Sequence, residues 1–166
     1  MTKYLIPAAI LTFVGCTKTQ EYRDAISDED FVQQASVVNT TEIDIGGLGT
    51  IRANDEGITE FAQMIAGYHK DVQNQLKSLA SGLNLVATDS LDAQHIMLEN
   101  QLLDLSGRSF DSIYIHTRVQ DYREAVQLFF QEMISGQNDQ LREYSASVLP
   151  QVESYLHLAD SLSSKY

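Results

Sequence analysis

The sequence contains little of several residue types. It has one cysteine, no tryptophan, two prolines and only 11 basic side chains against 23 acidic ones in 166 residues. A single cysteine excludes an internal disulfide framework and a zinc site built from thiolates. The net charge of −12 argues against a nucleic-acid partner, because phosphate binding needs clustered Lys and Arg. The length and the 43% apolar content are typical of one globular domain with a sizeable core.

The one cysteine, Cys16, follows the N-terminal segment MTKYLIPAAILTFVG. Lys3 precedes an apolar stretch, residues 4–15, that is too short to span a bilayer as a helix but is typical of a signal peptide. The string FVGC that ends at Cys16 resembles the lipobox of bacterial lipoproteins, although Phe13 stands where Leu is usual. We therefore expect residues 1–15 to be a lipoprotein signal peptide and 16–27 a lipidated tether. The alternative is an ordinary buried cysteine in an N-terminal helix.

Lipidation of Cys16 would determine where the protein is located. Removal of the leader takes away Lys3 and leaves 10 basic and 23 acidic side chains. Such a chain is repelled by anionic headgroups, so acyl chains and not a basic patch must provide the attachment. We expect a lipid-anchored protein of the bacterial cell envelope, on its periplasmic or outer membrane face.

The rest of the chain has the apolar periodicity of helices and no sustained strand-like alternation. Each of four long segments places apolar residues on one face, for example Phe61, Ile65, Tyr68, Val72 and Leu76 in the second. The pattern predicts an all-α fold over residues 28–163: an antiparallel four-helix bundle with a short extra helix between the second and third long helices.

Polar and glycine residues between the segments predict the helix ends. The expected N-caps are Asp28, Ser90, Ser109 and Asn138 or Asp139, and the expected stops are Asn54–Gly57, Ser81–Gly82, Ser106–Gly107 and Ser135–Gly136. The short extra helix is expected from Leu91 to about Leu105. Pro150 lies inside the last pattern, where it should kink the helix. Gly46, Gly47 and Gly49 are expected to allow close helix packing.

Several strings together resemble one protein family. The most specific is LSGRSFDSIYI (105–115), and others are DEDFVQQAS (28–36), TEIDIG (41–46), FAQMIAGYHKDVQNQLKSLA (61–80), DYREAVQLF (121–129) and LPQVESYLHLA (149–159). They resemble the domain-of-unknown-function 4142 family of exported bacterial helical proteins, over roughly residues 28–162. The resemblance implies a ferritin-like architecture and an envelope location. It brings no established reaction.

A ferritin-like bundle often holds a di-iron site with Glu-x-x-His motifs, but no His in this chain has a Glu three residues before it. The candidate site is instead a polar group on core-facing positions: Glu42, His69, Tyr122 and Tyr155. In the resembling family, the positions of His69, Tyr122 and Tyr155 typically carry histidines. Here one imidazole and one carboxylate remain, fewer than the three protein ligands of a usual catalytic zinc site.

Two interpretations of this group are open. In the first, it is a buried hydrogen-bond network in which Glu42 accepts from His69 or a tyrosine hydroxyl and helps to set the helix register. In the second, it is a degenerate metal or small-ligand site. We prefer the first, and expect no cofactor. We expect His95, His116 and His157 to lie at solvated or interface positions, and Arg118, Arg123 and Arg142 to pair with carboxylates.

Three functions follow from these observations. The leading hypothesis is a non-enzymatic lipoprotein that acts through an envelope protein partner or in envelope maintenance under stress. The second is a metal-binding or redox protein that uses the region of Glu42 and His69. The third is an exported module that binds a small apolar ligand between its helices.

Overall fold

The computed structural model of the protein describes residues 25–166. Over this range the chain forms five α-helices and no strand: α1 (Asp28–Arg52), α2 (Glu56–Gly82), α3 (Ala93–Leu103), α4 (Gly107–Ser135) and α5 (Asp139–Ser163). The prediction of an all-α fold is confirmed. The predicted signal peptide 1–15, Cys16 and most of the tether 16–27 lie outside the described residues.

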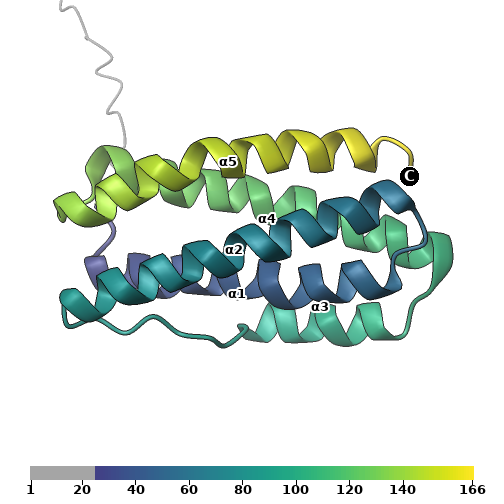
Figure 1. Ribbon diagram of the computed structural model, residues 1–166, viewed down its shortest axis with the longest axis horizontal. Coiled ribbons are helices and arrows are strands. Elements are labelled where there is room, and N and C mark those ends of the chain that lie inside the picture. Colours follow the sequence, from purple (N-terminus) through teal and green to yellow (C-terminus); the bar gives the residue numbers. More distant parts are fainter. Residues whose placement is uncertain (1–24) are drawn as a thin grey trace, which may run out of the picture.

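Four long helices lie side by side along the length of the molecule (Figure 1). Short links join α1 to α2 and α4 to α5, and each of these pairs packs along its length. The connection 83–106, which includes α3, returns along the molecule, so that α4 begins near the end where α2 begins (Figure 1). Helix α1 also contacts α4, and α2 contacts α5. As a result each long helix runs antiparallel to the neighbours it contacts.

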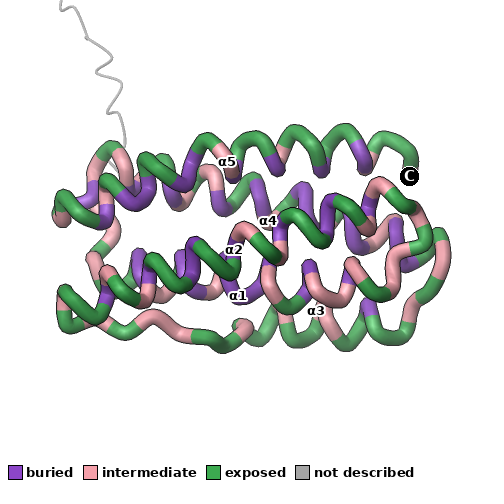
Figure 2. Tube along the Cα trace, viewed as in Figure 1, coloured by how far each residue is buried: buried purple, intermediate pink, exposed green. Residues whose placement is uncertain are grey.

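The apolar core lies between the long helices, and buried positions follow their inward sides (Figure 2). Burying each large apolar side chain contributes roughly 1.5–3 kcal/mol relative to leaving it in water. The large apolar side chains that are fully buried include Phe31 and Ile45 of α1, Phe61, Ile65 and Leu76 of α2, and Phe110 and Phe129 of α4. In the described part of the chain, none of the helices has the length and apolarity needed to cross a membrane.

Two of the predicted N-caps are wrong by one or two residues. Ser27 and not Asp28 caps α1, by accepting from the N–H of Asp30. Asp92 and not Ser90 caps α3, which is shorter at both ends than predicted. In each case the residue next to the first helical turn accepts the free N–H groups, which the apolar pattern alone does not locate.

The largest boundary error concerns Ser106 and Gly107. They were expected to end the short helix, but they begin α4, so Ser109, the predicted cap, lies within the first turn. Gly107 has a φ of +56°, a conformation that glycine adopts without steric cost. It therefore turns the chain into α4. Pro150 lies inside α5, as the sequence indicated.

Two of the three glycines of α1 allow close packing. A Cβ on Gly46 would lie 3.2 Å from the Cβ of Ala66 on α2, and one on Gly49 would overlap the ring of Tyr114 on α4. Gly47 differs, because a Cβ there would meet no atom within 4 Å. Close packing is thus confirmed at Gly46 and Gly49 and wrong at Gly47.

Candidate functional site

His69 lies in the core between the helices, with no exposed surface. Its Nδ1 is 2.9 Å from Asn39 Oδ1, and its Nε2 is 3.2 Å from the hydroxyl of Tyr122. Because the Asn39 oxygen only accepts, Nδ1 carries the proton and Nε2 accepts from Tyr122. Burial, together with the positive charge of Arg118, lowers the pKa of His69 to about 3. The imidazole is therefore neutral, with both nitrogens in use.

The hydrogen bonds of His69 continue through Asn39. The Asn39 amide N–H₂ donates to Gln73 Oε1 at 3.1 Å and to the Tyr144 hydroxyl at 3.2 Å. The Gln73 amide in turn donates to the carbonyl of Thr88 at 2.6 Å, in the connection between α2 and α3. The network thus joins all four long helices and the crossing segment, and a shift of any one helix would leave buried polar groups unpaired.

Tyr155 joins this group through its ring. Its ring centroid lies 5.8 Å from that of Tyr122, 6.4 Å from His69 and 5.5 Å from Tyr68. These distances are within the range of favourable aromatic pairs. Burial raises the pKa of Tyr68 to about 12, with a smaller effect of Tyr155. The aromatic rings therefore surround the imidazole with side chains that stay uncharged at neutral pH.

Glu42 belongs to a second, separate polar centre. Its Oε1 accepts from Arg118 Nη1 at 2.7 Å, and Arg118 Nη2 donates to Asp121. Arg118 is completely buried and Glu42 is 2% exposed. Burial opposes the charge of Arg118, but the two carboxylates outweigh it and raise the pKa of the guanidinium. Burial raises the pKa of Glu42, while Arg118 acts in the opposite direction.

The structure therefore divides the predicted site. His69, Tyr122 and Tyr155 come together, but the predicted acceptance by Glu42 from His69 or a tyrosine is wrong, because Arg118 takes its Oε1. The sequence expected Arg118 to pair with carboxylates, which is confirmed, yet it did not place Arg118 in the core. Its position three residues after Ile115 and four before Tyr122 is the signal that could have done so.

Asn39 and Gln73 are members of the network that were not among the predicted site residues. Asn39 lies four residues after Ala35 and three before Glu42, and Gln73 lies four after His69. Both are in helical register with core positions. Polar residues on an apolar face could therefore have been added to the candidate group.

His95 of α3 lies between two carboxylates. Its Nδ1 is 2.8 Å from Asp92 Oδ1, and its Nε2 is 3.6 Å from Asp121 Oδ2. The nearby carboxylate of Asp121 raises the pKa of His95, burial opposes this, and Asp92 adds to the increase. His95 thus sits at the contact between α3 and α4, whereas His116 and His157 are exposed, as expected.

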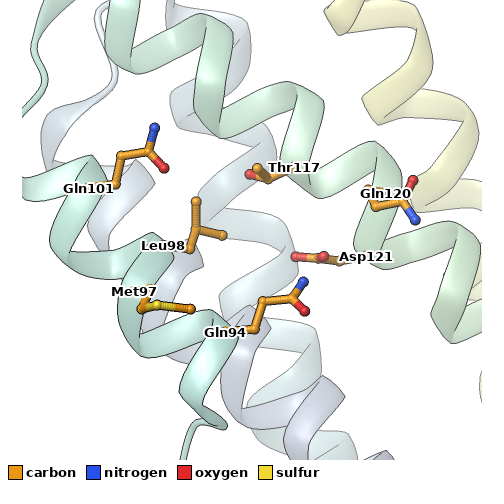
Figure 3. A pocket seen from close by; sticks show the side chains of 7 residues that line it. All are labelled: Gln94, Met97, Leu98, Gln101, Thr117, Gln120 and Asp121. Carbon is orange, nitrogen blue, oxygen red and sulfur yellow. The ribbon is translucent and has the colours of Figure 1, made fainter.

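A shallow groove of about 290 Å³ separates α3 from α4. Figure 3 shows its lining, with Gln94, Met97, Leu98 and Gln101 on α3 facing Thr117, Gln120 and Asp121 on α4. Asp121 is therefore shared between this groove and the buried ion pair with Arg118.

The buried donor set does not fit the di-iron centre of ferritin-like bundles. Such a centre needs carboxylates and imidazoles that are free to coordinate the metal. Here Glu42 is paired with Arg118, and both ring nitrogens of His69 are hydrogen-bonded, to Asn39 and to Tyr122. Within residues 25–166, no three His, Cys, Asp or Glu side chains are grouped so that they could hold a metal ion.

The fold defines the class of this protein: an all-helical domain with two buried polar centres, one around His69 and one around Arg118. The comparisons define the family. The domain of unknown function family DUF4142 matches residues 16–162, and the chain belongs to it. A solved structure with the same helical fold is a DUF305 protein from Streptomyces coelicolor that is described as secreted. It is 15% identical, with a TM-score of 0.67 over 80% of this chain and 88% of that chain. No protein with a curated description matches the sequence.

Proposed function

We propose that the protein is a non-enzymatic interaction module of the bacterial envelope, attached to the membrane through a lipid on Cys16. The observation that carries the non-enzymatic part is the use of both ring nitrogens of His69 by Asn39 and Tyr122. An imidazole that is neutral and doubly bonded stabilises helix register and has no free atom for proton transfer or ligation. The ion pair of Glu42 with Arg118 supports the same role for the second centre.

The proposed architecture is a ferritin-like four-helix bundle. Two helical hairpins joined by one long connection are characteristic of that fold, and α3 lies in such a connection here. The likeness to a protein described as secreted agrees with an envelope location.

The lipid anchor is tested by growing cells with a clickable fatty acid. We expect the protein to incorporate the label and to lose it in Cys16→Ala, because only the cysteine after the apolar leader is a lipidation site. Labelling that persists in Cys16→Ala, or is absent from the wild type, would show that the anchor is wrong.

The exposed apolar side chains of α3 support a protein partner. Ile96, Met97 and Leu103 are large apolar residues that remain exposed on one short helix. Exposed apolar groups of this kind mark contact surfaces. We expect crosslinking in intact envelopes to capture a defined partner, and Met97→Ser to weaken that capture. The control is Met64→Ser, which changes an exposed methionine on α2.

The alternative of a metal-binding or redox protein has a direct test. Protein purified without a His tag is analysed for iron, zinc and copper. Stoichiometric metal that disappears in His69→Ala would replace our proposal with the alternative. Absence of metal in the wild type, together with a defined crosslinked partner, would support the interaction role. If crosslinking captures no partner and deletion of the protein causes no envelope phenotype, the interaction role loses its support.

A further inference from the structure

Two adjoining cavities lie where α1, α3 and α4 meet. The outer one has a volume of about 270 Å³ and the inner one about 40 Å³. Val38, His95 and Glu124 line both, so the two cavities adjoin, and we refer to them together as the path. The path runs from the surface between α1 and α4 toward the buried ion pair of Glu42 with Arg118.

Two residues that line the inner cavity have a buried oxygen without a hydrogen-bond partner. Thr41 and Glu42 line it, and they are 1% and 2% exposed. Thr41 Oγ1 and Glu42 Oε2 have no hydrogen-bond partner anywhere in residues 25–166. Leaving such groups unpaired costs about 1–3 kcal/mol each, and more for a charged group. A ligand that donates hydrogen bonds here would recover that cost.

The charges around the path favour a cation. Carboxylates line it from α1, from α4 and from the N-cap of α3: Glu42, Asp121, Glu124 and Asp92. Arg118 already binds two of them, Glu42 and Asp121. His95, between Asp92 and Asp121, is the one titratable base that lines the cavities. Even with His95 protonated, the formal charge of this set is negative.

The shape and chemistry of the path select the kind of cation. The inner cavity is large enough for one ammonium group, which is about the size of a water molecule. An ammonium group has three donors, which match the unpaired oxygens. The outer cavity has aliphatic walls from Val37, Val38 and Leu128 and polar groups from Gln33 and Gln34. A metal ion is a poorer match, because the described residues hold no group of three ligating side chains.

We propose that this path binds a linear aliphatic amine or diamine. The ammonium group enters the inner cavity and donates to Glu42 Oε2 and Thr41 Oγ1. The methylene chain lies along Val37, Val38 and Leu128, and the second amino group of a diamine reaches Asp92 at the mouth. This site is separate from the His69 network.

The test is isothermal titration calorimetry of the full-length protein at pH 7.5 with 1,5-diaminopentane, 1-pentylamine and 1-pentanol. Both amines are charged at this pH, because an alkylamine has a pKa near 10.4. We expect saturable one-to-one binding of the amines, and none of 1-pentanol, which has the same chain without the charge. Thr41→Val should weaken amine binding about tenfold or more, because it removes a hydrogen bond to a charged group.

The matched control is Thr117→Val, which makes the same change in the groove between α3 and α4. Thr41→Val leaves the Glu42 side chain in place, and thermal unfolding of each variant verifies that it is folded. Unchanged affinity in Thr117→Val supports the proposal. The proposal is overturned if the amines give no saturable binding, if 1-pentanol binds equally, or if both variants lose the same affinity. None of these results depends on a lipid or a protein partner, so failure here leaves the proposed envelope role standing.

Discussion

Glu132, in the last turn of α4, provides the sharpest test of the structure. Its side chain is fully buried, and neither carboxylate oxygen has a hydrogen-bond partner within the described residues. Burial raises the pKa of Glu132 to about 7, the charge of Asp28 adds to this, and Arg142 opposes it. A negative charge is also unfavourable at the C-terminal end of a helix, where the carbonyl groups point.

The free-energy cost of ionising Glu132 follows from its raised pKa. Because the folded-state pKa lies above the usual value of 4.5, the folded protein binds this proton more tightly than the unfolded chain does. The free energy of unfolding therefore falls as the pH rises from about 4.5 to about 7, and the full cost of ionising Glu132 remains above that pH. A pKa difference of one is equivalent to about 1.4 kcal/mol. Allowing for screening by water at the end of the molecule, we expect a cost of about 1–3 kcal/mol.

The perturbation is Glu132→Gln, which keeps the shape and cannot ionise. We expect it to stabilise the protein by about 1–3 kcal/mol at pH 8 and by much less at pH 4, where Glu132 is already protonated. Urea unfolding at both pH values measures the difference. The control is Glu153→Gln, at an exposed position on α5, which should change little at either pH. Destabilisation by Glu132→Gln at pH 8, or the same effect at both pH values, would refute the reasoning.

Three further predictions concern the core and α3. Gly49→Ala should destabilise the protein by about 1–3 kcal/mol, because the added Cβ would overlap the buried ring of Tyr114. Gly47→Ala, where a Cβ meets no atom within 4 Å, should stabilise the protein by about 0.5–1 kcal/mol. Thermal unfolding measures both changes. Arg118→Met should cost about 3–5 kcal/mol in urea unfolding because it leaves Glu42 buried and unpaired; a neutral result would contradict the ion pair. His95→Gln should destabilise the protein by about 0.5–1 kcal/mol at pH 6 and have less effect at pH 9. The pKa of His95 is raised in the folded protein, so the protonated imidazole stabilises the fold at pH values below its unfolded-state pKa. That stabilisation is lost as the pH rises through the folded-state pKa and the imidazole deprotonates.

The helices and their inward faces could be predicted because they depend on local periodicity. Residues three and four apart meet on one side of a helix whatever lies opposite, and so Phe61, Ile65 and Leu76 were assigned to the core from spacing alone. Boundaries were harder. At Ser106 and Gly107 the same two residues can end one helix or begin the next, and the tertiary path of the connection decides between them.

The candidate site was predicted only in part, for the same physical reason. The sequence placed His69, Tyr122 and Tyr155 on core-facing positions, and they meet. The sequence did not predict that Arg118 forms an ion pair with Glu42, which is 76 residues away in the chain. Partners across helices depend on how far each helix is rotated and shifted against its neighbour, and no local pattern contains that information.

The sequence by itself determined that this protein is helical, strongly acidic and related to its family, since these properties belong to composition and to residues close together in the chain. Only the tertiary structure decided which buried polar groups are paired. It satisfied both nitrogens of His69 and left Thr41 Oγ1 and Glu42 Oε2 unpaired beside a cavity. That difference arises because a hydrogen bond between helices needs its two atoms within about 3 Å, a condition that only the packed arrangement sets.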